Sequence, residues 1–94
     1  MTYRLAKRAR ADVLDIWRHI ATDNEIAADR FIDLVIRRFR LLGENPYAGR
    51  LREDLRPGYR SFAVGEYLIL YRVGDPGAQI LHVVHGRRDI KALL

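Results

Sequence analysis

The order of two hydrophobic periodicities is the sequence feature that most limits the fold. In the first half, apolar residues recur at steps of three and four, as they do along one face of a helix. In the second half, three short apolar segments are separated by turn motifs, which is typical of strands joined by hairpins. The sequence therefore predicts an α+β fold, with an N-terminal helical hairpin packed on a small antiparallel β-sheet.

The first helix is predicted over residues 7–21, with Trp17 beside its apolar face. The second is predicted to begin at Thr22, because Glu25 three residues later completes a capping-box pattern, and to end at Gly43. Its apolar positions cover roughly 220°, whereas a surface helix usually needs about 100°. The second helix must therefore be contacted on more than one side, by the sheet, by the first helix or by another chain.

Three strands are predicted over residues 59–64, 67–73 and 79–85. Gly65-Glu66 and Asp75-Pro76-Gly77 supply the turns between them, so the strands should form an antiparallel meander. The segment Tyr3-Arg4-Leu5 is predicted as an edge strand. Residues 90–94 form an apolar tail that is too short to be a stable helix alone.

Both faces of the predicted sheet are apolar. Leu68 and Leu70 point to one face, and Tyr67, Ile69 and Tyr71 point to the other. Two helices cover one face of a small sheet, so the second face is expected to be an exposed patch that binds a partner. The alternative is that the C-terminal tail folds over this face.

Composition excludes several classes of protein. The 94 residues indicate a single domain, residues 1–94, and the absence of cysteine excludes disulfides, thiolate metal sites and a cysteine nucleophile. Three scattered histidines do not suggest a zinc site, so neither a metal nor a cofactor is expected. No apolar run reaches the roughly 20 residues of a membrane helix. No hydrophobic run follows the basic N-terminus, so we expect a cytoplasmic protein without a signal peptide.

The charge balance is basic. Seventeen Lys and Arg residues against 12 Asp and Glu give a net charge of +5, and nearly all the basic residues are arginine. Guanidinium groups match carboxylates and phosphates, so an acidic protein and a nucleic acid are both suitable partners. A solvated basic surface without a partner and a non-toxic nucleic-acid-binding module remain as alternatives.

Several segments, taken in their order and spacing, resemble the RelE/ParE toxin family, and specifically its ParE-like branch. The resemblance covers essentially the whole chain. It is carried by Tyr3-Arg4-Leu5, residues 9–13 with Ile16-Trp17, Asn45-Pro46 with Gly49, Leu55-Arg56-Pro57-Gly58-Tyr59-Arg60, residues 67–73 and residues 83–89.

The resemblance implies the toxin of a type II toxin–antitoxin operon, which inhibits growth and contributes to plasmid stabilisation. It also implies neutralisation by a cognate, ParD-like antitoxin whose acidic C-terminal segment wraps the toxin, with operator DNA contacted only through that antitoxin. Folding of a disordered segment onto such a surface is physically reasonable. The antitoxin-binding residues expected from the wide helical arc and the apolar sheet are Trp17, Ile32, Ile36, Tyr67, Ile69 and Tyr71.

The family has two branches with different targets. The RelE-like branch cleaves mRNA on the ribosome, and the ParE-like branch is associated with inhibition of DNA gyrase. RNA cleavage needs a base, an acid and a cation that stabilises the phosphorane-like charge. His85 could serve as acid or base, Arg88 and Arg60 as phosphate clamps, and Tyr71 as a proton donor. A structural histidine at a strand end, bonded to backbone, is the alternative role for His85.

Two departures from the nuclease pattern favour the ParE-like function. Ribosome-dependent members tend to carry a basic residue on the central strand and a Tyr or His near the C-terminus. Leu68 and the tail Ala92-Leu93-Leu94 occupy those places here, and leucine neither clamps phosphate nor moves a proton. We therefore expect a binding inhibitor rather than an enzyme, unless the chain is an inactive family member. The predicted target-binding residues are Arg60, Arg72, Arg87 and Arg88.

Overall fold

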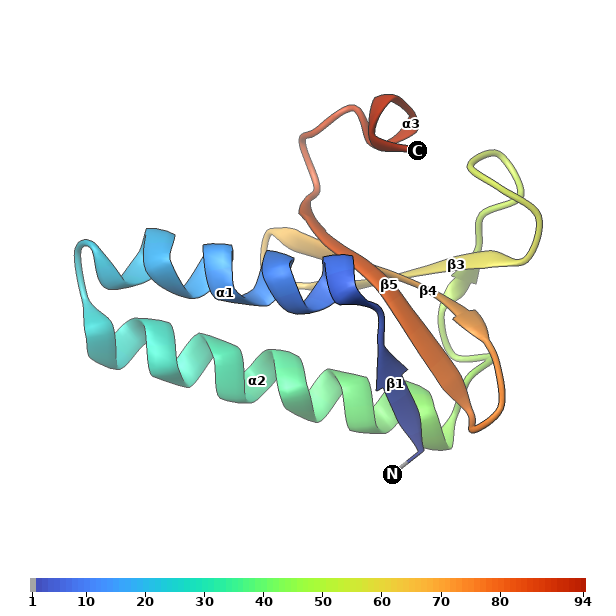
Figure 1. Cartoon of the computed structure of the whole chain (residues 1–94), viewed down its shortest axis with the longest axis horizontal. Coiled ribbons are helices and arrows are strands. Elements are labelled where there is room, and N and C mark those ends of the chain that lie inside the picture. Colours follow the sequence, from blue (N-terminus) through green and yellow to red (C-terminus); the bar gives the residue numbers. More distant parts are fainter. Residues whose placement is uncertain (1) are drawn as a thin grey trace.

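The computed structural model describes residues 2–94 and confirms the predicted fold class, with two long helices packed on a five-stranded sheet (Figure 1). The two helices form a hairpin whose closed end extends past the sheet (Figure 1). In chain order the elements are β1 (Tyr3–Leu5), α1 (Lys7–Ala21), α2 (Glu25–Glu44), β2 (Arg50–Leu51), β3 (Tyr59–Val64), β4 (Tyr67–Val73), β5 (Ala78–His85) and α3 (Ile90–Leu93).

The sheet has the order β1-β5-β4-β3-β2 and is mixed. The meander of β3, β4 and β5 is antiparallel, as predicted, while β1 pairs in parallel with the first residues of β5. The two-residue strand β2 pairs with β3 and was not predicted. A strand of two residues is too short to show an alternation of apolar and polar side chains, so it cannot be recognised from the sequence pattern.

The ends of α2 differ from the prediction. Asn24, not Thr22, caps the helix, because the Asn24 side-chain oxygen accepts the Ala27 N–H at 3.0 Å. The Thr22 hydroxyl instead donates to the Arg18 carbonyl at 2.9 Å. Gly43 does not end the helix, which continues to Glu44. A Cβ atom on Gly43 would lie 2.7 Å from the carbonyl oxygen of Thr2, so close packing against the N-terminus explains this glycine.

The main core lies between the helical hairpin and one face of the sheet. The side chains of Val35, Phe39, Ile69 and Ile80 are almost completely buried there. Helix α2 contacts α1, β1, β3 and β5, so elements of the same chain cover its wide apolar arc. The fold therefore does not require a second chain against this helix.

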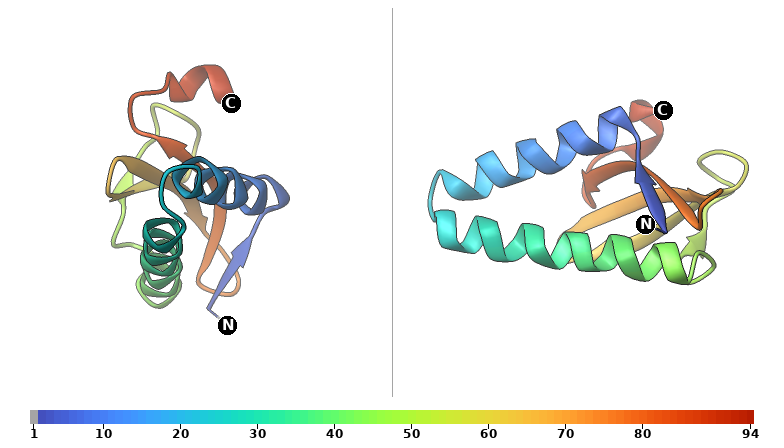
Figure 2. Two further views of the ribbon diagram at one scale, coloured as in Figure 1. Left: turned by 90° about the vertical axis from the view of Figure 1, so that its left-hand side faces the viewer. Right: turned by 60° about the horizontal axis from the view of Figure 1, so that its bottom comes forward.

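The C-terminal tail covers the apolar part of the second face of the sheet, contrary to the expected exposed patch. Ile90 of α3 packs on Leu70 and Val84, and all three side chains are at least 92% buried. The guanidinium of Arg56 donates a hydrogen bond to the main-chain oxygen of Leu94, which holds the end of the tail. Figure 2 shows α3 on the other side of the sheet from α2. The alternative prediction, in which the tail folds over this face, is correct.

The large apolar side chains that remain exposed lie on five separate segments and not on one continuous strand or helix. They are Leu14, Ile26, Tyr47, Leu51 and Val73. Within residues 2–94, none of the helices combines the length and hydrophobicity that a bilayer crossing requires.

Candidate functional site in the cleft between α1 and β5

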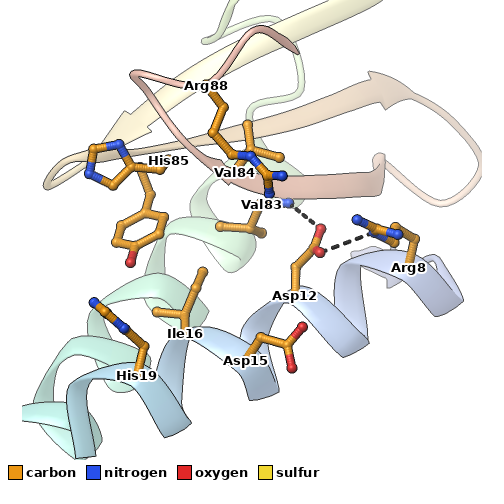
Figure 3. Close-up of a pocket in the computed structure, with 10 residues that line it drawn as sticks. Arg8, Asp12, Asp15, Ile16, His19, Val83, Val84, His85 and Arg88 are labelled. Atoms are coloured by element: carbon orange, nitrogen blue, oxygen red, sulfur yellow. Dashed lines mark hydrogen bonds and ion pairs between the residues drawn. The ribbon is translucent and has the colours of Figure 1, made fainter. Parts of the chain in front are cut away.

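A cleft of about 280 Å³ lies between α1 and the last residues of β5 (Figure 3). We call it the α1–β5 cleft. It combines acidic, basic and imidazole side chains with an apolar floor. Its lining residues are Arg8, Asp12, Asp15, Ile16, His19, Tyr67, Val83, Val84, His85 and Arg88.

One face of α1 supplies half of this lining. Arg8, Asp12, Asp15 and His19 follow one another at steps of four, three and four, so they project from the same side of the helix. These four residues were not predicted from the sequence, because charged side chains at helical spacing are also typical of a solvated face. The buried position of Asp12, which is 9% exposed, separates this face from an ordinary surface.

Asp12 closes the edge of β5. Strand β1 ends at Leu5. The next residue, Ala6, donates its backbone N–H to the Ile80 carbonyl at 2.8 Å. Beyond that point the Asp12 carboxylate accepts the Val83 backbone N–H at 3.0 Å and the Arg8 Nε–H at 3.2 Å. Both carboxylate oxygens are therefore engaged within the chain.

His85 lies at the end of β5, at the mouth of the cleft. Its Nδ1 accepts the Arg87 backbone N–H at 3.2 Å, so Nε2 carries the hydrogen in the neutral ring. Nε2 lies 3.5 Å from the carboxylate of Glu66, and the ring packs edge-on against Tyr67 with centroids 5.3 Å apart. The backbone bond is the one expected for a structural strand-end histidine.

Arg88 brings positive charge to the same cleft. Its backbone N–H donates to the His85 carbonyl at 3.0 Å, which forms the tight turn after β5. Among residues 2–94, the structure shows no hydrogen bond or ion pair of the Arg88 guanidinium. Asp15 has a side chain that is 74% exposed and pairs with Arg18 at 3.9 Å. The cleft therefore offers a guanidinium to an incoming anion.

His82 is close to the cleft, on the neighbouring part of β5. Burial lowers the pKa of His82 below its usual 6.5, and the charge of Arg8 adds to this effect while Asp12 opposes it. The neutral form of His82 is therefore favoured in the folded chain.

The structure does not bring the four candidate nuclease residues together. Tyr71 pairs with Ile80, whereas His85 pairs with Tyr67. Tyr67 and Tyr71 are four positions apart on β4, a distance of roughly 13 Å. His85 and Arg88 meet at the α1–β5 cleft, while Tyr71 and Arg60 lie together near the other end of the meander.

Tyr71 and Arg60 both hold the loop that follows α2. The Tyr71 hydroxyl accepts the Gly49 N–H and donates to the Pro46 carbonyl, each at 2.8 Å. Arg60 donates to the Gly49 carbonyl at 2.8 Å, with its guanidinium 5.1 Å from the ring centroid of Tyr47. Burial raises the pKa of Tyr71 above its usual 10.0. A buried hydroxyl that makes two hydrogen bonds to the backbone has a structural role.

The sequence matches the family described as "ParE toxin of type II toxin-antitoxin system, parDE" over residues 3–90. The chain belongs to the ParE toxin family. It is 37% identical over 94 residues to Toxin ParE1 of Caulobacter vibrioides, covering 98% of this chain and 96% of that protein. It is 32% identical over 84 residues to Toxin ParE3 of the same organism, covering 88% of this chain and 84% of that protein.

The fold of this ParE-family chain is also found in a solved structure, "Chromosomal ParDE TA system from P. aeruginosa". The two superpose with a TM-score of 0.76 at 23% sequence identity, covering 90% of this chain and 95% of the other. This similarity confirms the architecture of two helices on a small sheet.

The predicted target-binding arginines of this ParE-family chain lie in three places. Arg87 and Arg88 are exposed in the turn after β5. Arg72 is exposed on β4, where its Nε donates to Gln79 at 2.9 Å. Arg60 is half-buried against the loop after α2. They do not form one contiguous cluster, and Arg60 has a structural role.

The predicted antitoxin-binding residues also divide. Ile69 and Tyr71 have no exposed surface, so they belong to the core of the chain and are unavailable to a partner in this fold. Tyr67 is half-buried and lines the α1–β5 cleft. Trp17 is half-buried and donates from Nε1 to Asp29 at 2.8 Å across the hairpin. Ile32 and Ile36 of α2 are also half-buried.

Proposed function

We propose that this chain is the toxin of a cytoplasmic type II toxin–antitoxin pair, that a cognate ParD-like antitoxin neutralises it, and that it inhibits DNA gyrase by binding. The observation that carries the proposal is the family match over residues 3–90. By this proposal the toxin arrests growth, stabilises a plasmid that carries the pair, and meets operator DNA only through the antitoxin.

The α1–β5 cleft is the part of the surface that we assign to the antitoxin. The Arg88 guanidinium is available there, while the Asp12 carboxylate is already occupied by Arg8 and the Val83 N–H. An acidic side chain of a partner would meet positive charge on entering, and the ring of Tyr67 provides apolar contact. An extended acidic segment satisfies both features.

Binding rather than catalysis is supported by the separation of the candidate nuclease residues. General acid–base chemistry needs its groups within hydrogen-bond reach of one substrate atom. Tyr71 is buried and roughly 13 Å of strand from His85, and Leu68 packs beneath the C-terminal tail. His85 and Arg88 are thus separated from the other two candidate residues, Tyr71 and Arg60, which supports an inhibitor that acts by contact.

The antitoxin assignment is tested by a binding measurement on the co-expressed pair. We expect Arg88→Ala to weaken antitoxin binding by about fivefold, because rim ion pairs contribute at most about 1 kcal/mol. Arg10→Ala is the matched control, since Arg10 is exposed on the same helix as Arg8 but does not line the cleft. Equal losses in the two variants would contradict the assignment of the cleft.

The target is tested in a gyrase supercoiling assay. Added toxin should stop supercoiling, and prior addition of the antitoxin should restore it. A reporter mRNA translated in vitro serves as the second arm of the experiment, because a RelE-like nuclease would cleave it at the ribosome. Unchanged supercoiling at excess toxin would show that gyrase is not the target. Cleavage of the mRNA would show that the toxin is a nuclease and does not act by binding alone.

A further inference from the structure

We propose that the sheet face turned away from the helical hairpin binds the phosphodiester backbone of a nucleic acid through three strand-borne arginines. We call this surface the arginine face and define it by Arg4, Arg50 and Arg72, with Tyr59 beside them. This contact does not depend on sequence, so it leaves the specific recognition of operator DNA to the antitoxin and goes beyond the proposed binding of an antitoxin and of gyrase.

The charges of the chain are distributed unequally between helices and strands. The five strands contain four arginines and no acidic residue. Residues 7–44, which form the hairpin, contain eight basic and seven acidic residues, a net charge of only +1. The basic excess of the chain is therefore concentrated on the sheet, which gives one part of the molecule a positive potential.

Strand register places three of these arginines on one face. Arg50 lies opposite Ser61, and Ser61 lies opposite Leu70, which packs beneath α3. Residues directly opposite in a sheet share a face, so Arg50 points away from the hairpin. Arg60 precedes Ser61 on β3, so its side chain points to the opposite face, toward the hairpin.

A second row on the same face contains the other two arginines. Arg72 is two residues beyond Leu70 on β4 and therefore points to the same side. Tyr59 and Gln79 lie opposite Arg72 on the flanking strands, and Arg4 lies opposite Gln79. Arg4, Arg50 and Arg72 are all exposed.

The spacing of the three guanidinium groups suits a phosphate chain. Arg4 and Arg72 are two strands apart, and β2 with Arg50 is two strands further on. At about 4.8 Å per strand, the arginines recur at roughly 10 Å intervals over about 20 Å. A nucleic-acid strand with one charge per about 3.4 Å of axis presents several phosphates across that width.

The contacts on this face leave its charge in place. Gln79, a neutral side chain, accepts the Nε–H of Arg72 at 2.9 Å and orients the guanidinium without neutralising it. Arg52 lies near the same face, 3.5 Å from the Ser61 hydroxyl, but Asp54 pairs with it at 3.0 Å. Tyr59 supplies an aromatic ring next to Arg72, against which a base can stack.

A phosphate backbone fits this surface better than an acidic polypeptide does. Protein partners are anchored mainly by side chains that fill apolar pockets. On this side of the sheet the apolar residues Leu68, Leu70 and Val84 are occupied by the tail residues of α3. Backbone recognition of a nucleic acid requires charge at a suitable spacing and no apolar pocket.

The test measures binding of the full chain to fluorescent oligonucleotides of about 20 nucleotides, as single-stranded DNA, single-stranded RNA and duplex DNA of two sequences, between about 50 and about 200 mM salt. We expect binding that does not depend on sequence. The R4Q/R50Q/R72Q variant should bind at least about tenfold more weakly, with a salt slope reduced by about three units. Comparison of the three oligonucleotide types shows whether the surface prefers single-stranded DNA, single-stranded RNA or duplex DNA.

The matched control is R30Q/R37Q/R40Q, which removes the same charge from exposed positions of α2. This control should change affinity far less. Equal weakening by both triple variants, or tighter binding of polyglutamate than of any oligonucleotide, would overturn the proposal. Arg4→Gln and Arg50→Gln are also measured singly, so a misfolded triple variant does not end the test. Neither gyrase nor antitoxin is present, so the result is independent of the proposed function.

Discussion

The carboxylate of Asp12 in α1 accepts the backbone N–H of Val83 in β5 at 3.0 Å, across 71 positions of sequence. Strand β1 is too short to cover this part of β5, so a helix side chain provides the acceptor that a neighbouring strand would otherwise supply. The bond links the hairpin to the sheet and forms one wall of the α1–β5 cleft (Figure 3).

Replacement of this acceptor should destabilise the fold. Asp12→Ala leaves the Val83 N–H without its partner in a buried position, and we expect a loss of about 2 kcal/mol in the free energy of unfolding. Arg8→Ala should cost under about 1 kcal/mol, since the Arg8 side chain is 60% exposed. Urea unfolding of both variants measures the difference. Similar losses would show that the ion pair, rather than the backbone bond, is the important contact.

The hydroxyl of Tyr71 should contribute comparably, because it joins two backbone groups of the loop after α2. Tyr71→Phe removes the partner of the Gly49 N–H and of the Pro46 carbonyl, so we expect a loss of about 2 kcal/mol. Tyr47→Phe is the control, since Tyr47 is 70% exposed and should change stability by less than about 0.5 kcal/mol. Tyr71→Phe with wild-type stability would contradict this account of the loop.

His82 should make stability depend on pH below neutrality. Its pKa is lowered in the folded chain, so between the unfolded value of 6.5 and the lower folded value the unfolded state binds more protons. The contribution of His82 is present above pH 6.5 and is lost as the pH falls through the folded pKa. Urea unfolding at a series of pH values should show a smaller decline for His82→Gln than for the wild type. His19→Gln, at an exposed position, should follow the wild type.

The C-terminal tail should stabilise the chain through one main contact. Ile90→Ala opens space above Leu70 and Val84, and we expect a loss of about 2 to 3 kcal/mol. Lys91→Ala, at the exposed neighbouring position, should have almost no effect. Thermal unfolding compares the two, and light scattering shows whether the Ile90 variant self-associates through the uncovered face. Equal stability would mean that the tail covers the sheet without stabilising it.

Local pattern predicted the elements well where the signal repeats. The bounds of α1, β3 and β4 agree with the predicted segments, because each contains several apolar residues at one clear period. The start of α2 was wrong because Thr22 and Asn24 are both common capping residues. The hydrogen bond from Ala27 to Asn24 decides between them, and it depends on the path of the chain between the helices.

The candidate site was harder to predict. His85 and Arg88 were selected for their chemistry, and the structure places both at the α1–β5 cleft. Arg60 and Tyr71 were selected on the same grounds, but they hold a loop elsewhere. Asp12 was missed because one acidic residue on a helix resembles any solvated carboxylate until its distant partner is known.

The sequence by itself determined the order of helices and strands, the turns between them, the basic charge and the family, since each depends on residues close together or on their order along the chain. Only the tertiary structure decided that the tail covers the apolar part of the second sheet face, that β1 pairs with β5, and that Asp12 reaches Val83. The physical reason is that periodicity shows which way a side chain points. What that side chain meets is decided by segments far away in the chain, through packing and buried hydrogen bonds.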